Sequence, residues 1–253
     1  DMLVRSILFN IVLYLNFTVL AIVFSPIMVL PQRWGWPVVR LWARSSLWWH
    51  RLICGSKEDV SGLENRPEGG YIVACKHQSA WEAFRMVTLV DKPAFIVKRE
   101  LMWLPLFGWY MKRFGQIPVN RGKRSAALAA MTEHAKRAIA NGQQVIIFPE
   151  GTRRPPGIEP HYRYGIVHMY KTLGVPCLPI ALNSGLYWPR RSIIHTPGTV
   201  QVEILPPIEP GLSGDVFAER LQREIESASD RLIEEALERD PAVRRILDRT
   251  NST

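Results

Sequence analysis

The chain has 253 residues, of which 47% are hydrophobic and 22% are charged, and its formal net charge is +9. This length suffices for one full hydrophobic core, and the composition excludes an intrinsically disordered protein. Its three cysteines form no Cys-x-x-Cys pair, which argues against a disulfide framework or a thiolate metal site and favours a reducing compartment.

The first predicted element is an apolar segment at residues 7–30, interrupted by two asparagines and one proline. Because roughly 20 apolar residues span a bilayer, it is long enough to cross a membrane or to enter and return. A signal peptide is the alternative, but no small-x-small cleavage site follows. The next charged residues are all basic until Glu58, so the positive-inside rule predicts that the rest of the chain lies in the cytoplasm.

Residues 36–53 are predicted to form a helix at the membrane surface. At 100° per residue its three arginines fall within about 40° of one another, and its apolar residues share a separate face. The arginines are Arg40, Arg44 and Arg51, and the apolar face holds Val38, Leu41, Trp42, Trp48, Trp49 and Leu52. Trp favours the bilayer interface and Arg favours anionic headgroups. The alternative is an ordinary amphipathic helix of the core.

From residue 58 onward, short apolar runs alternate with helical patterns. Strands are predicted at 71–75, 94–97, 116–119, 144–148, 175–181 and 200–205, and helices at 81–90, 103–113, 124–141, 162–173 and 215–238. This alternation predicts an α/β fold with a mixed, largely parallel sheet flanked by helices. We therefore expect a membrane-anchoring helical hairpin at residues 1–57 and a catalytic domain at residues 58–253.

The middle of the chain is basic, since residues 92–124 hold eight Lys and Arg against one acid. This indicates an anionic partner, such as nucleic acid, lipid headgroups or a phosphorylated substrate, unless it is simply a solvated surface. The Gly-x-Ser-x-Gly, Gly-x-Gly-x-x-Gly, Walker A and His-Glu-x-x-His signatures are missing. We therefore expect neither a cofactor nor a metal. The histidines expected to be packed or on the surface are His50, His134, His161, His168 and His195.

The segment KHQSAWE at residues 76–82 places a histidine and a carboxylate between a strand and a helix. Active sites collect at strand ends in open α/β sheets, and across such a turn Glu82 can face back to His77. A carboxylate on one ring nitrogen fixes the tautomer, so the other nitrogen can act as a general base. The alternative is that Glu82 completes a capping box with Ser79. We expect that one carboxylate cannot serve both purposes fully.

The segment IIFPEGTRRP at residues 146–155 runs from a strand into a turn with glycine, a hydroxyl and two guanidinium groups. Glycine permits close approach of the backbone to a ligand, and arginine binds phosphate through two hydrogen bonds. The pattern predicts a phosphate-binding turn, with an ordinary basic loop as the alternative.

In their order along the chain, these segments resemble four motifs of the 1-acyl-sn-glycerol-3-phosphate (lysophosphatidate) acyltransferase family. Residues 77–82 look like the first, His-x4-Asp, with Glu82 in place of the usual Asp. Residues 98–121 look like the second, residues 148–153 match the third very closely, and residues 175–181 look like the fourth. The resemblance covers roughly residues 70–185 and implies the fold of the glycerolipid acyltransferases.

The resemblance also implies roles for individual residues. His77 would deprotonate the sn-2 hydroxyl of a 1-acylglycerol-3-phosphate, which then attacks a thioester, and Glu82 would orient His77. Lys98 is expected to stabilise the tetrahedral oxyanion, with backbone amides as the alternative. The residues expected to bind the acceptor phosphate, or to shape the turn that binds it, are Arg121, Glu150, Gly151, Thr152 and Arg153.

The implied partners are acyl-CoA or acyl carrier protein as donor, lysophosphatidic acid as acceptor, and the lipid bilayer. Nucleic acid is not expected, because the basic residues accompany apolar, Trp-rich segments. The product would be phosphatidic acid, made at the cytoplasmic face of the inner membrane. Two alternatives stay open. One is an acyltransferase for another lysophospholipid or a lyso-aminolipid, and the other is a non-catalytic membrane protein that binds anionic lipid.

Overall fold

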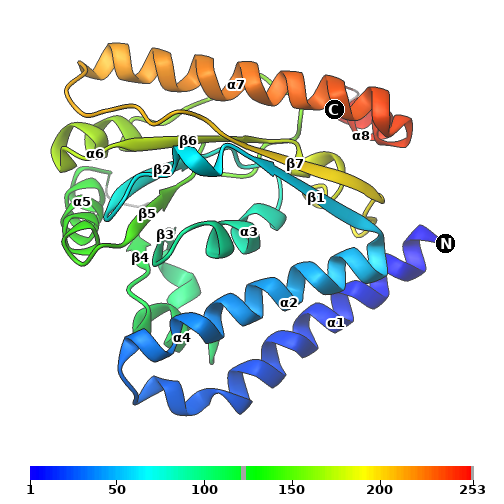
Figure 1. Cartoon of the computed structure of the whole chain (residues 1–253), viewed down its shortest axis with the longest axis horizontal. Helices are drawn as coiled ribbons and strands as arrows, with labels where there is room; N and C mark the ends of the chain where they lie inside the picture. Colours follow the sequence, from blue (N-terminus) through cyan, green and yellow to red (C-terminus); the bar gives the residue numbers. More distant parts are fainter. Residues whose placement is uncertain (121–123, 252–253) are drawn as a thin grey trace.

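A sheet of seven strands lies at the centre of the molecule (Figure 1). The structure is a computed structural model that describes residues 1–120 and 124–251. The strand order is β1-β7-β6-β2-β5-β3-β4, and every neighbouring pair is parallel except β6 with β7. The strands are β1 (Ser56–Ser61), β2 (Tyr71–Cys75), β3 (Pro93–Lys98), β4 (Ile117–Val119), β5 (Gln144–Ile147), β6 (Cys177–Leu182) and β7 (Gly198–Ile204). The predicted mixed, largely parallel sheet is confirmed.

Helices cover both faces of this sheet, as Figure 1 shows. One face carries α5, α6 and α7, and the other carries α3 together with the antiparallel pair α1 and α2. The helices are α1 (Met2–Val23), α2 (Trp36–Cys54), α3 (Trp81–Leu89), α4 (Phe107–Arg113), α5 (Arg124–Ala140), α6 (Gly165–Leu173), α7 (Gly214–Arg239) and α8 (Arg244–Asn251).

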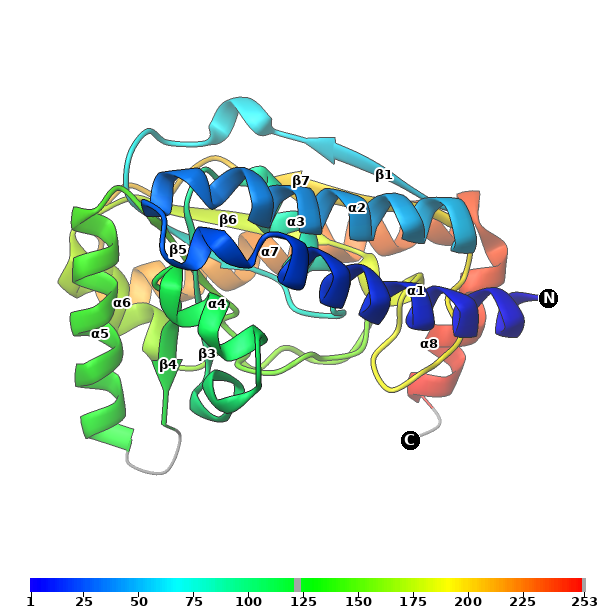
Figure 2. The same cartoon turned by 90° about the horizontal axis from the view of Figure 1, so that it is seen from below.

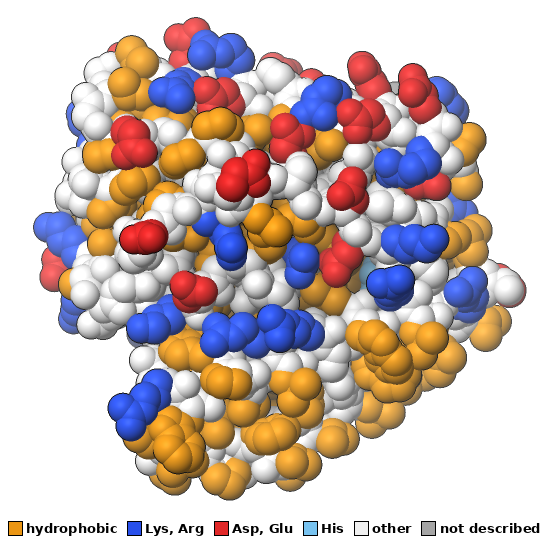
Figure 3. Space-filling model, in the orientation of Figure 1, with side chains coloured by type: hydrophobic (Ala, Val, Ile, Leu, Met, Phe, Trp, Pro, Cys, Tyr) orange, Lys and Arg blue, Asp and Glu red, His pale blue; other side chains and the backbone are white. Residues whose placement is uncertain are grey.

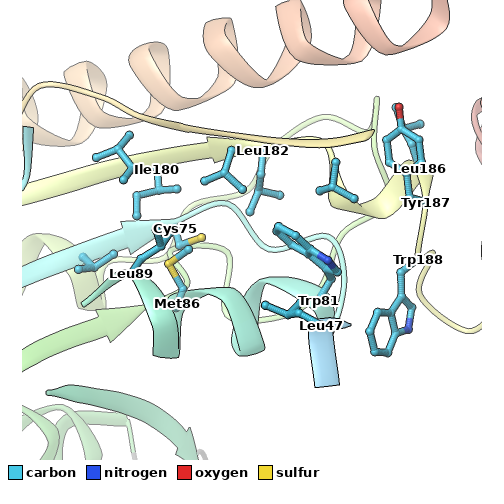
Figure 4. Close-up of a cluster of buried hydrophobic side chains, with 14 of the residues drawn as sticks. Leu47, Cys75, Trp81, Met86, Leu89, Ile180, Leu182, Leu186, Tyr187 and Trp188 are labelled. Carbon is cyan, nitrogen blue, oxygen red and sulfur yellow. The ribbon is translucent and has the colours of Figure 1, made fainter. Parts of the chain in front are cut away.

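Strand β2 is apolar throughout because it is buried on both faces, as a central parallel strand should be. Its side chains alternate between the two layers of the core. Val73 and Cys75 pack with α1, α2 and α3, whereas Ile72 and Ala74 pack with α5, α6 and α7. Figure 4 shows part of the first layer, in which Trp81 and Met86 of α3 lie beneath β6.

Helices α1 and α2 form an antiparallel hairpin that packs on the α/β body (Figure 2). Phe9 of α1 is fully buried there. Helix α1 is long and apolar enough to cross a membrane, yet only 17% of its most apolar 18-residue stretch is buried in the protein. The predicted hairpin is confirmed, and it leaves a large apolar surface open.

The prediction that the apolar residues of α2 share a single face is wrong in part. Leu41, Trp48 and Leu52 are exposed at the surface, but Trp42 packs against Phe17 of α1 and Phe84 of α3. The helix contacts both α1 and α3, so its apolar residues divide between an outer row and an inner row.

Two other elements differ from the sequence-based expectation. Strand β1 was not predicted, because it is a mostly polar strand at the edge of the sheet and lacks an apolar pattern. Of the helix expected at 103–113, only α4 is α-helical, because Trp103 instead ends a 3-10 turn, η4 (Arg99–Trp103). Between them Leu106 takes a positive φ of 62°, which a continuous helix does not allow.

Candidate active site

The carboxyl ends of β2, β5 and β3 lie at one edge of the sheet, because these three strands are parallel neighbours. His77 follows β2, the turn at residues 148–153 follows β5, and Lys98 ends β3. This is the edge at which ligands bind in open α/β sheets. Strand order therefore brings the first three sequence motifs together.

His77 and Glu82 form the pair that the sequence predicts. The Nδ1–H of His77 donates to Oε1 of Glu82 at 2.9 Å, so Nε2 is the unprotonated nitrogen of the neutral ring. The ring stacks on Phe148 of the β5 turn, with centroids 3.8 Å apart. The His77 side chain is 17% exposed and lines a cavity. The ring is therefore held in one orientation while Nε2 is left to act as a base.

The Glu82 carboxylate is fully buried and accepts four hydrogen bonds. Besides His77, the backbone N–H groups of Gln78 and Ser79 donate to Oε1 at 2.6 and 2.7 Å, and the hydroxyl of Ser184 donates to Oε2 at 2.7 Å. The expectation that one carboxylate cannot serve both the helix start and the histidine is wrong. A single oxygen accepts from both, because the turn folds the two N–H groups and the ring around it.

A cavity of about 1060 Å³ extends from His77. Its apolar part lies between α1, α2, α4 and β3, and residues such as Phe17, Trp42 and Phe114 line it. Its polar end is basic. The basic residues that line the cavity are Lys98, Arg124, Arg153, Arg163 and Arg190, with His77 and His161. Among the described residues, no Asp or Glu lines it, so the cavity suits an amphipathic ligand with an anionic group.

The turn after β5 presents Gly151, Thr152 and Arg153 to this cavity. Gly151 has a positive φ of 69°, and a Cβ at this position would lie 2.7 Å from Nε of Arg163. Glycine is therefore favoured by the backbone conformation, and any larger residue would also displace the Arg163 side chain. The N–H of Arg154 donates to the carbonyl of His77 at 2.8 Å, which joins this turn to the histidine.

Glu150 lies behind the turn and does not line the cavity. Its carboxylate is 3.2 Å from Nζ of Lys76 and 3.6 Å from Nε of Arg154. Lys76 also contacts Glu226 of α7 at 2.8 Å. Burial raises the pKa of Glu150, and Lys76 opposes this shift. These ion pairs hold the turn in place on its buried side, away from the cavity. The Glu150 side chain therefore supports the conformation of the turn and does not face a ligand.

Lys98 is exposed at the rim of the same cavity. Arg121 lies outside the described residues. Sequence reasoning missed Ser184, which comes from the segment after β6, and Arg190, which comes from the following loop. Neither stands in a pattern that a short sequence window could reveal, because each reaches the site only through the order of the strands.

His50, Cys54 and His195 form a buried cluster away from this cavity, with possible metal-ligating atoms within 4.8 Å of one another. Burial raises the pKa of Cys54 to about 11 and lowers that of His195 to about 4. The two imidazoles share a hydrogen bond of 2.9 Å. These neutral, mutually bonded groups fit a packing role. His50 and His195 were expected to be packed or on the surface, and both are buried.

Comparisons with known proteins agree with this geometry. A sequence model of the family described as "Acyltransferase" matches residues 57–183. The chain belongs to this acyltransferase family. It is 35% identical over 206 residues to the 1-acyl-sn-glycerol-3-phosphate acyltransferase of Pseudomonas aeruginosa, covering 80% of each chain. It is 31% identical to the alpha form of that enzyme from Mus musculus over 170 residues, 65% of this chain and 60% of the mouse protein.

The fold of this acyltransferase also has a counterpart among solved structures. The 1-acyl-sn-glycerophosphate acyltransferase PlsC from Thermotoga maritima superposes with a TM-score of 0.78. The match covers 92% of this chain and 98% of that chain at 24% sequence identity. The resemblance to the family drawn from the four motifs is thus confirmed, as is the expectation that the chain is an acyl-transferring enzyme.

Proposed function

We propose that the protein transfers a fatty acyl group from acyl-CoA or acyl carrier protein to the sn-2 hydroxyl of 1-acylglycerol-3-phosphate, giving phosphatidic acid. The observation that carries this proposal is the 2.9 Å His77–Glu82 hydrogen bond at the end of a cavity whose described lining is apolar and basic, without acids. The Pseudomonas and mouse relatives, named for this activity, support the same acceptor.

In the proposed reaction His77 acts first as a base and then as an acid. Nε2 takes the proton of the acceptor hydroxyl as its oxygen bonds to the thioester carbon. The tetrahedral intermediate collapses with cleavage of the carbon–sulfur bond, and the thiolate takes the proton back from the imidazolium. The Glu82 carboxylate stabilises that imidazolium. An ester and a free thiol result, so no covalent enzyme intermediate is needed.

Three further roles belong to the proposal. Arg153 and Arg121 bind the acceptor phosphate, and Gly151 and Thr152 shape the turn beside it. Glu150 supports the turn without contacting the ligand, because its ion pairs with Lys76 and Arg154 hold the turn in place. Lys98, at the rim of the cavity, stabilises the oxyanion of the tetrahedral intermediate.

We further propose that the hairpin and α4 sit in the cytoplasmic face of the inner membrane. Figure 3 shows an apolar lower part with few acidic groups and a band of Lys and Arg where it meets the charged upper part. The hairpin carries exposed apolar residues such as Ile11 and Trp48, and η4 and α4 add Trp103 and Trp109. Such a surface suits burial in one leaflet with the cations at the headgroups.

Thiol release on mixing acyl-CoA with lysophosphatidic acid tests the proposed activity. We expect His77→Ala to lower kcat/KM by about 10³-fold, with melting temperature and vesicle binding unchanged. His134→Ala is the matched control, because His134 is exposed on α5 and does not line the cavity. Normal turnover by His77→Ala would refute the assignment. A panel of lysolipid acceptors separates lysophosphatidic acid from the alternative acceptors, and absent thiol release would favour a non-catalytic lipid-binding protein.

A further inference from the structure

The loop at residues 188–197, between β6 and β7, brings one arginine to the active-site cavity from outside the four motifs. Arg190 lines the cavity together with His77 and Arg153. Its Nη1 donates a hydrogen bond to the carbonyl oxygen of Arg153 at 2.5 Å. The guanidinium of Arg190 is therefore fixed against the backbone of the phosphate-binding turn, although the two residues are 37 positions apart.

The surroundings of Arg190 are strongly positive. Partial burial and the guanidinium groups of Arg191, Arg153 and Arg154 lower the pKa of Arg190. Within the described part of the chain, no carboxylate lies at ion-pair distance from Arg190 or Arg153. Like charges that line the same end of a cavity favour the binding of an anion that neutralises them.

The loop that carries Arg190 is well supported. Trp188 packs edge-to-face on Phe9 of α1, with ring centroids 5.2 Å apart, and the N–H of Thr196 donates to the carbonyl of Tyr187 at 2.8 Å. Arg190 is thus already ordered before a ligand binds. Little conformational entropy is then lost on binding, so more of the free energy of its contacts contributes to affinity.

We propose that Arg190 and Arg153 together bind a phosphomonoester dianion, so that Arg190 makes the enzyme prefer an acceptor with a terminal phosphate over a phosphodiester lysolipid. This inference rests on the proposed function. A phosphomonoester carries a charge of about −1.5 to −2 near pH 7, which two guanidinium groups can match. A phosphodiester carries one charge, and one of its oxygens is blocked by the headgroup. Two guanidinium groups therefore discriminate between them by both charge and hydrogen bonding.

Arg190→Gln tests this site, with Arg191→Gln as the matched control. Arg191 is adjacent and carries the same charge, but it is exposed and does not line the cavity. We expect Arg190→Gln to raise the KM for lysophosphatidic acid by about 10- to 100-fold, with kcat and the KM for acyl-CoA little changed. The preference over lysophosphatidylglycerol should fall by a similar factor. Arg191→Gln should change each value by less than about twofold, and Arg190→Lys should recover part of the loss.

Three outcomes would overturn the inference. A rise in the KM for acyl-CoA alone would assign Arg190 to the phosphates of the donor, and equal losses with both acceptors would remove its role in selectivity. Direct binding of glycerol 3-phosphate to the full chain in detergent separates this inference from the proposed function. If the wild type binds glycerol 3-phosphate and Arg190→Gln does not, the dianion site stands even if lysophosphatidic acid is not acylated. Equal binding by both would refute the site.

Discussion

Replacing Glu82 by Gln removes one negative charge and leaves the shape of the side chain nearly unchanged. The amide oxygen of Gln can still accept from His77 Nδ1 and from the two backbone N–H groups that now donate to Oε1. The amide NH2 can donate to the hydroxyl of Ser184, which now donates to Oε2. We therefore expect the fold to tolerate the substitution, at a cost of about 1 to 2 kcal/mol.

The loss in catalysis should be much larger, because the charge stabilises the imidazolium that forms during the reaction. Nδ1 and Oε1 are 2.9 Å apart, so we treat the two delocalised charges as unit charges separated by about 4 Å. At an effective dielectric constant of about 20, their attraction is about 4 kcal/mol. Since about 1.4 kcal/mol corresponds to a factor of ten in rate, we expect kcat to fall by about 10³-fold.

Steady-state thiol release at saturating acyl-CoA and lysophosphatidic acid measures this effect, and thermal unfolding checks the fold. Ser184→Ala is the matched control, because it removes one hydrogen bond from the same carboxylate but keeps the charge. That variant should lose less than about tenfold in kcat. If folded Glu82→Gln keeps kcat within tenfold of the wild type, the carboxylate does not stabilise an imidazolium and the reasoning is wrong.

Three further predictions concern stability. Lys76→Met should lower the free energy of unfolding by about 3 to 5 kcal/mol in a denaturant titration, because it leaves two carboxylates without their shared cation. Burial lowers the pKa of His195 from 6.5 to about 4, so the unfolded chain binds the proton first. The contribution of His195 to the free energy of unfolding, about 3 kcal/mol, should be present above pH 6.5 and be lost as the pH falls towards 4. His195→Asn should flatten the dependence of the unfolding free energy on pH over this range. Gly108→Ala would place a Cβ 2.1 Å from the carbonyl oxygen of Met102 and should lower the melting temperature by about 5 °C or more, whereas Gly165→Ala, with 3.6 Å of space, should not.

Much of the site could be predicted from the sequence because its central contacts are local. His77 and Glu82 are five residues apart, and one strand-to-helix turn is enough to bring them together. The turn from Phe148 to Arg153 carries its glycine and its arginine within one short segment. The alternation of apolar runs with helical patterns likewise indicated the α/β sheet, since strand and helix periods are properties of each segment alone.

Tertiary structure alone decided the contacts between distant segments. Ser184 reaches Glu82 across 102 residues, and Glu226 reaches Lys76 across 150 residues. These contacts depend on strand order, because β6 lies next to β2 and α7 packs on β6. Tertiary packing also explains the polar edge strand β1. It likewise explains why the apolar residues of α2 divide between the surface and the cavity. Periodicity in one segment indicates that a face is apolar, but only the packed neighbours determine whether that face meets the core, a ligand or a membrane.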